Sequence, residues 1–147
     1  MPVAQFHLPS AAFDPERRRE LLVRASAGYA RILDSPIERV RVLLVDYPPA
    51  DIAVGGVVGS EPGPETAAPY FTAVVLAGRP AQQRAELLGH FTDLLVEILG
   101  VDRSGVRGRI IEVEPDNWGI AGTPAARVRS EEIARRAVKN APAQLGR

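Results

Sequence analysis

The proline at position 2 and the arginines are the residues of this sequence that could do chemistry. Removal of the initiator Met1 would leave Pro2 with a free secondary amine. Burial or neighbouring cations would lower the pKa of such an amine from about 7.7–8.0, because they disfavour its charged form. A neutral amine can take a proton from carbon next to a carbonyl and return it elsewhere, which interconverts the enol and keto forms of a 2-oxo acid. Arg79 lies at a predicted strand-to-helix turn, where its guanidinium could bind a carboxylate through two hydrogen bonds.

Composition argues against several other functions. The 147 residues include no cysteine and two histidines, which excludes thiol nucleophiles and disulfide scaffolds and disfavours a metal site. We expect no metal, and no organic cofactor either, because proton transfer by Pro2 requires none. Seventeen arginines and one lysine balance 18 acidic residues, so no overall field attracts nucleic acid or a membrane, and we expect neither as a partner. The N-terminal residues lack the basic and apolar regions of a signal peptide, and no apolar run approaches the roughly 20 residues of a membrane span, so we expect a cytoplasmic protein.

An internal repeat organises the chain. A shift of 66 positions places Leu21 and Leu22 on Leu87 and Leu88, and Arg41 on Arg107. Two copies are too few for a solenoid, so we expect a single pseudo-symmetric domain. Its predicted parts are repeat 1 at about 2–58, a connection at about 59–68, repeat 2 at about 69–125 and a tail at about 126–147.

Each copy has the pattern of a strand, a helix and a second strand. The predicted strands cover residues 3–8, 39–46, 70–76 and 106–113. The first helix begins after Asp14 and the second at Pro80, and Ser130 is the predicted N-cap of a terminal helix reaching about Asn140. These patterns predict an α/β fold in which two β-α-β units form a four-stranded sheet with two helices on one face. The other face is too apolar for water, so we expect oligomerisation to cover it.

Four features together resemble the tautomerase superfamily, and more narrowly two fused copies of the 4-oxalocrotonate tautomerase subunit. They are Pro2 after Met1, the segment PIERVRV at 36–42, the Gly78-Arg79 pair, and NWGIAG at 117–122. The resemblance covers residues 2–125 and implies a trimer of fused chains. It also implies that Pro2 is the general base and then acid.

The resemblance assigns the remaining site residues. Arg79 and Arg41 match the family's two substrate-binding arginine positions, and Arg107 is the repeat-related alternative to Arg41. Trp118 matches an aromatic residue that lines the apolar side of the pocket. Pro69 aligns with Pro2 but is internal, so its amide nitrogen cannot act as a base.

The expected function is a tautomerase of small 2-oxo or 2-hydroxy-enoic acids that works as a homotrimer on a carboxylate substrate. One alternative is dehalogenation, hydration or decarboxylation of a small 3-carbon acid. Relatives that dehalogenate carry a second arginine where this chain has Leu76, and a carboxylate near the apolar stretch 120–123, which counts against that chemistry. Another alternative is a catalytically silent trimer with a binding or structural role. In that case the arginines are solvent-exposed surface charges without a role in binding, and Trp118 packs in the core or at an interface.

Two features stand apart from this expected chemistry. His7 alternates with apolar residues on the first strand, so we expect it to pack structurally or at an interface. The last fifteen residues carry four basic and no acidic side chains. We expect this tail to be solvated, with a bridge to a neighbouring acidic subunit as the alternative.

Overall fold

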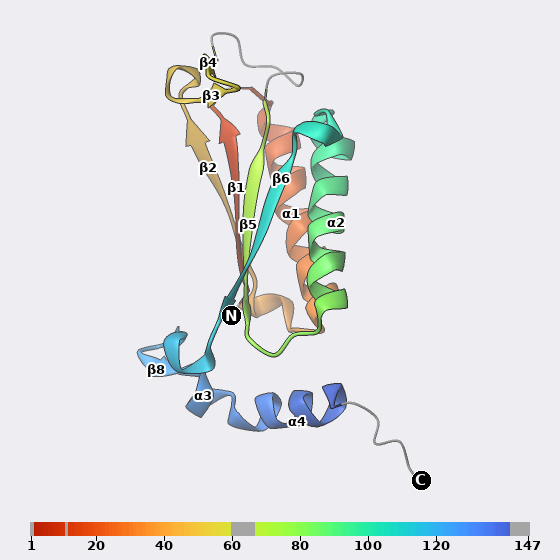
Figure 1. Ribbon diagram of the computed structural model, residues 1–147, viewed down its shortest axis with the longest axis vertical. Helices are drawn as coiled ribbons and strands as arrows, with labels where there is room; N and C mark the ends of the chain where they lie inside the picture. The colour runs from red at the N-terminus through yellow and green to blue at the C-terminus, as the bar shows by residue number, and fades with distance from the viewer. Residues whose placement is uncertain (1, 11, 60–66, 142–147) are drawn as a thin grey trace.

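A computed structural model describes residues 2–10, 12–59 and 67–141, and it contains a four-stranded sheet with two long helices on one face (Figure 1). The sheet has the order β2-β1-β5-β6. Its strands are β1 (Val3–Pro9), β2 (Arg41–Tyr47), β5 (Tyr70–Leu76) and β6 (Arg107–Val113). Within each unit the strands are parallel, and β1 and β5 pair antiparallel at the centre. The predicted fold class is confirmed.

Local sequence signals start and stop the two long helices, α1 (Pro15–Leu33) and α2 (Ala81–Leu99). The Asp14 side chain accepts a hydrogen bond from the Arg17 amide and Pro15 occupies the first turn, which together favour a helix start. Gly100 ends α2 with a φ of +68°, a left-handed conformation that glycine adopts without steric cost. Both helices lie beside each other on the sheet (Figure 1).

The core lies between the sheet and the helices and is rich in aromatic rings. Phe6, Phe71 and Phe91 are fully buried, and the ring centroids of each pair lie 5.3–5.7 Å apart. The Tyr29 ring meets Phe91 edge to face at 5.3 Å. Such contacts stabilise aromatic pairs beyond the burial of their area, so the rings hold both β-α-β units to one another.

Ion pairs repeat with the sequence period. Arg18 of α1 contacts Asp46 of β2 at 2.7 Å, and Arg84 of α2 contacts Glu112 of β6 at 2.7 Å. Each partner of the second pair lies 66 positions after its counterpart, so the two units have the same helix-to-strand contact.

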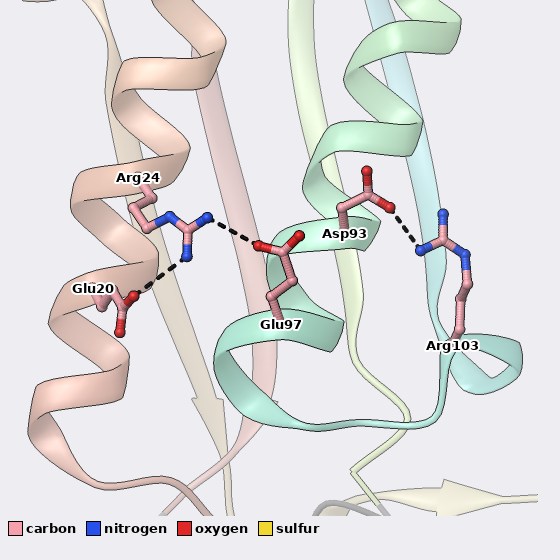
Figure 2. A network of polar contacts seen from close by, with 5 residues as sticks. All are labelled: Glu20, Arg24, Asp93, Glu97 and Arg103. Atoms are coloured by element: carbon pink, nitrogen blue, oxygen red, sulfur yellow. Dashed lines mark hydrogen bonds and ion pairs between the residues drawn. The ribbon is translucent and has the colours of Figure 1, made fainter.

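A second set of polar contacts links the helices at the surface (Figure 2). Arg24 of α1 contacts Glu20 at 3.3 Å and reaches across to Glu97 of α2 at 2.9 Å. Arg103 contacts Asp93 at 2.7 Å. These side chains are about half exposed, so solvent screens the pairs and they add little stability.

Short elements connect the sheet to two hairpins. The first hairpin turns at Gly55 and Gly56, whose φ angles are +60° and +80°. The second follows β6, and Figure 1 places it at the end of the sheet where the N-terminus lies. The short elements are η1 (Ile37–Arg39), η2 (Pro49–Asp51), β3 (Ala53–Val54), β4 (Val57–Val58), η3 (Arg103–Gly105), η4 (Pro115–Asn117), β7 (Gly119–Ile120), β8 (Thr123–Pro124) and α3 (Ala125–Val128).

A terminal helix, α4 (Ser130–Asn140), crosses beneath the end of the sheet (Figure 1). Ser130 was predicted as its N-cap, but that assignment is wrong: Ser130 is the first helical residue and Arg129 holds the cap position without a side-chain bond. The reason is that α3 leads almost directly into α4, and the Arg129 carbonyl already accepts from the Ile133 amide. Within the described residues, no helix is long and apolar enough to cross a membrane.

No described element covers the second face of the sheet. Leu43 on this face is 46% exposed and Tyr70 is 37% exposed. His7 lies among these side chains, where its Nδ1 is 2.7 Å from the Tyr47 hydroxyl and its ring stacks on Tyr47. Partial burial lowers the pKa of His7. This face therefore exposes apolar and aromatic side chains beside polar ones such as Gln5 and Arg109.

Candidate active site

Pro2 and Arg79 line the same cavity, which has a volume of about 340 Å³. The antiparallel pairing of β1 and β5 explains why Pro2 and Arg79 lie at the same end of the sheet. Val3 at the start of β1 is opposite Val74 near the end of β5, so the N-terminal residue lies beside the turn that follows β5. Pro2 is buried there. Two residues that are 77 positions apart in the chain thus share one wall.

The turn after β5 and the end of α1 together hold Arg79. Gly78 has a φ of +105°, which glycine tolerates and which directs the chain into α2. The Arg79 guanidinium donates to the Leu33 carbonyl at 2.5 Å and to Gln83 Oε1 at 3.4 Å. Leu33 is the last residue of α1, and the carbonyls at a helix C-terminus attract a cation. This anchoring fixes the side chain before any ligand arrives.

Burial lowers the pKa of Arg79, but the guanidinium keeps its positive charge at neutral pH. Removal from water, and then the positive charge of Arg136, lower the pKa of Arg79 to about 10. The group therefore stays protonated at neutral pH. Its Nε atom is buried and has no hydrogen-bond partner among the described residues. An anionic ligand could satisfy this donor and the charge together.

Tyr29 supports the cavity from the core side. Its ring is fully buried, and its hydroxyl donates to the Val74 carbonyl, with the Val3 carbonyl 3.4 Å away. The same residue therefore contacts the strand that follows Pro2 and the strand that precedes Arg79. Burial raises the pKa of Tyr29, so the hydroxyl is neutral and serves as a donor.

The cavity lining is strongly cationic. Basic side chains outnumber acidic ones by six to two, the basic ones being Arg39, Arg79, Arg129, Arg135, Arg136 and Lys139 and the acidic ones Asp34 and Glu132. Glu132 accepts two hydrogen bonds of 2.9 Å from the Arg39 guanidinium, which lower the pKa of its carboxyl. A carboxylate held in this way is ionised and already paired. The remaining charge favours a small anion.

Apolar side chains form the rest of the wall. They are contributed by α1, the residues after it, β5 and α4, namely Leu33, Pro36, Val74, Val75, Leu76 and Ile133. Within the described ranges, no group of three or more histidine, aspartate or glutamate side chains could hold a metal ion. An apolar wall beside fixed cations suits a small organic acid with a carbon skeleton.

The other candidate residues lie outside this cavity in the single chain. The Arg41 amide donates to the Pro2 carbonyl at 2.9 Å, so Arg41 begins β2 beside Pro2, and its side chain is exposed. The Arg107 amide makes the corresponding bond to the Pro69 carbonyl at 3.1 Å, at the other end of the sheet. Trp118 lies in the turn before β7 and does not line the cavity.

Sequence reasoning predicted Arg79 but none of the other polar residues of the cavity, among them Arg39, Gln83 and Arg136. Gln83 follows Arg79 by four positions, the spacing of neighbours on a helix, which was a usable signal. Glu132 and Arg136 have the same spacing on α4. Nothing in the sequence indicated that this helix packs over Pro2. Met1, whose removal would free the Pro2 amine, lies outside the described residues.

Comparisons with known proteins agree with this arrangement. The family model described as tautomerase enzyme matches residues 2–61 and again 69–127. The 2-hydroxymuconate tautomerase of Pseudomonas putida is 38% identical over 56 residues, which cover 38% of this chain and 87% of that protein. A probable tautomerase of Ralstonia nicotianae is also 38% identical over 56 residues and is covered to 80%.

Solved structures extend the likeness to the tandem arrangement. A native fused 4-OT has a TM-score of 0.76 and 28% identity, over 86% of this chain and 98% of that one. A protein inactivated by 2-oxo-3-pentynoate has a TM-score of 0.77 over the same shares at 23% identity, which shows a common fold. The double match to the family model, together with the tandem β-α-β architecture, shows that this chain belongs to the tautomerase family as a fused, two-repeat member.

Proposed function

We propose that the protein is a tautomerase that interconverts the enol and keto forms of small 2-oxo acids, with Pro2 as the proton carrier. The observation that supports this best is the shared cavity of Pro2 and Arg79. It combines an N-terminal amine, once Met1 is removed, with a fixed guanidinium in a cationic and partly apolar space. The relatives named as tautomerases support the same reaction type.

The reaction needs one residue that transfers the proton and one residue that binds the substrate carboxylate. In ketonisation, the Pro2 nitrogen accepts the hydroxyl proton of the enol, and the resulting ammonium donates a proton to the carbon that was double-bonded to the enol carbon. Arg79 binds the carboxylate and stabilises the negative charge that develops on the 2-oxygen. Because Arg79 is already held by the Leu33 carbonyl, little reorganisation accompanies this step.

Assembly into a homotrimer is part of the proposal. The uncovered apolar face of the sheet supports it, as do fused 4-OT structures with the same fold that are described as trimers. Neighbouring subunits would then bring Arg41 or Arg107 as a second substrate arginine and Trp118 as an apolar wall. Size-exclusion chromatography with light scattering measures the expected threefold mass.

Hydrolytic dehalogenation is the less favoured chemistry on this scaffold. Leu76 lines the cavity, so β5 presents an apolar side chain where a second arginine would be needed. Glu132 is a cavity carboxylate that could act as a base on water, but both of its oxygens accept hydrogen bonds from Arg39. Chloride release from 3-chloroacrylate should therefore stay at background.

The test is ketonisation of phenylenolpyruvate and 2-hydroxymuconate, followed by ultraviolet absorbance. Wild-type protein whose intact mass shows loss of Met1 should accelerate the reaction, and the Pro2→Ala variant should not. Arg127→Gln is the control, because Arg127 is exposed on α3 and does not line the cavity. If Pro2→Ala matches the wild-type rate, the catalytic assignment is wrong and the silent trimer is the better description.

A further inference from the structure

The terminal helix α4 is not part of the tautomerase repeat, yet it forms one wall of the Pro2 cavity. The family model ends at residue 127, and α4 begins at Ser130. Residues of α4 that line the cavity include Glu132, Ile133, Arg136 and Asn140. In Figure 1 the helix runs across the end of the sheet at which the N-terminus lies. A segment outside the repeat thus closes the site.

Polar contacts fasten α4 at both of its ends. Near its start, Glu132 accepts the two 2.9 Å hydrogen bonds from Arg39 of η1. The side chains of this pair are 24% and 32% exposed, so water screens it less than it screens an open surface pair. At the last helical residue, Nδ2 of the Asn140 side chain donates to the Gly78 carbonyl at 3.2 Å. Gly78 directly precedes Arg79, so this contact fixes α4 to the turn that carries Arg79.

Arg136 lies between these two contacts on the same side of the helix. Positions 132, 136 and 140 follow one another by four residues and therefore share a face. The outer two members of this row are used to dock the helix. Arg136 lines the cavity and, among the described residues, makes no hydrogen bond or ion pair of its own.

The surroundings of Arg136 favour an anion. Burial lowers the pKa of Arg136, and the charge of Arg136 in turn helps to lower that of Arg79. Two guanidinium groups that repel each other across a partly buried space are stabilised when an anion lies between them. Glu132 offsets part of this repulsion by its charge, but both of its oxygens are hydrogen-bonded to Arg39, and burial still lowers the pKa of Arg136 and of Arg79.

We propose that α4 supplies Arg136 as a carboxylate-binding residue in addition to those of the repeats, so that the substrate anion is held between Arg79 of repeat 2 and Arg136 of the appended helix. This inference rests on the proposed function for its substrate, a small organic acid, but the anion site itself does not need Pro2. The tail therefore contributes specificity for anions in addition to closing the cavity.

The test compares Arg136→Gln with Arg127→Gln, which removes an exposed arginine outside the cavity. Arg136→Gln should raise the KM for phenylenolpyruvate by about tenfold or more, because a charge-assisted hydrogen bond to the substrate is lost. Arg136→Lys should restore part of the affinity, and Arg127→Gln should leave KM unchanged. An Arg136→Gln variant with the same KM as Arg127→Gln would overturn the proposal.

Binding of fumarate, measured by calorimetry on the Pro2→Ala background, separates this inference from the proposed function. Fumarate is an anion without an enol, so its affinity depends on the cationic cavity and not on proton transfer. Arg136→Gln should weaken fumarate binding by about tenfold in this background. If Pro2→Ala retains full ketonisation activity but Arg136→Gln still weakens fumarate, only the proposed function fails. If Arg136→Gln binds fumarate as the parent does, the anion site is wrong.

Discussion

Replacing Gly108 by alanine should destabilise the fold, although alanine is normally the easier residue to order. Gly108 of β6 lies opposite Phe71 of β5 in the parallel register. A Cβ added at Gly108 would lie 2.2 Å from Cζ of the Phe71 ring and 2.6 Å from both Cε atoms. Carbon atoms do not approach so closely, so the phenyl ring would have to move.

The size of the effect follows from how little room the ring has. Phe71 is fully buried and packs against Phe6 and Phe91 at centroid distances of 5.7 and 5.5 Å. Overpacking of this kind costs about 1–3 kcal/mol, and the lower entropy of the unfolded alanine chain offsets roughly 0.5–1 kcal/mol. The added Cβ would lie within 2.6 Å of three atoms of a fully buried ring, so the upper half of the overpacking range applies. The net loss of about 1–2.5 kcal/mol corresponds to a fall in Tm of roughly 2–10 °C for a domain of this size.

The corresponding pair in the first unit offers a rescue. Ala4 and Val42 hold the second positions of β1 and β2, where β5 and β6 carry Phe71 and Gly108. Phe71→Ala alone should cost about 3–5 kcal/mol through the cavity it leaves. The double variant Phe71→Ala/Gly108→Val recreates the first unit's pair, and its loss should be smaller than the sum of the two single losses.

Urea denaturation followed by circular dichroism measures Gly108→Ala and the four proteins of the cycle, which are wild type, Phe71→Ala, Gly108→Val and the double variant. Gly119→Ala is the control, because a Cβ at Gly119 meets nothing within 4 Å and the residue has no positive φ. The reasoning is refuted if Gly108→Ala is as stable as wild type, or if the double variant loses the full sum of the single effects.

Three further changes test other parts of the structure. Tyr29→Phe should lower the free energy of unfolding in urea by about 1–3 kcal/mol, because the Val74 carbonyl loses its buried donor; an unchanged midpoint would contradict this. Gly89→Ala should instead raise the free energy of unfolding by up to about 1 kcal/mol, because alanine favours a helix and a Cβ at position 89 meets nothing within 4 Å. A loss of stability would contradict this. Stability should fall as the pH drops below about 6.5, because burial lowers the pKa of His7 and the unfolded chain binds the proton first. His7→Gln should reduce this pH dependence without removing it, because burial also lowers the pKa of His90, and an identical pH profile would exclude His7 as a source.

Features encoded by near neighbours in the chain were predicted well. Asp14 and Pro15 start α1, and Gly100 ends α2, because caps depend on side chains and backbone angles within one turn. The strand and helix order followed from hydrophobic periodicity in the same way. The repeat boundaries stay a prediction.

The meeting of Pro2 with Arg79 was harder to foresee. Periodicity shows which segments are strands, but it does not show that β1 and β5 pair antiparallel at the centre of the sheet. Without that pairing, the sequence does not show that Arg79 lies near Pro2. The register places Arg79 there within one chain.

The basic tail was interpreted from charge alone and expected to be solvated. In the structure its helix docks through Glu132 and Asn140, which no composition count could single out. The i, i+4 row of positions 132, 136 and 140 is visible in the sequence, but its partners Arg39 and Gly78 lie more than 60 positions away. Long-range docking of this kind requires the folded structure.

The dependence of the ketonisation rate on removal of Met1 tests the central claim most directly. Protein made with methionine aminopeptidase inhibited keeps Met1, so Pro2 is an amide there, and later treatment with the peptidase frees its amine. We predict that the phenylenolpyruvate rate rises in proportion to the fraction of processed chain, as measured by intact mass. A rate that does not change as Met1 is removed would contradict the assignment of Pro2 as the proton carrier.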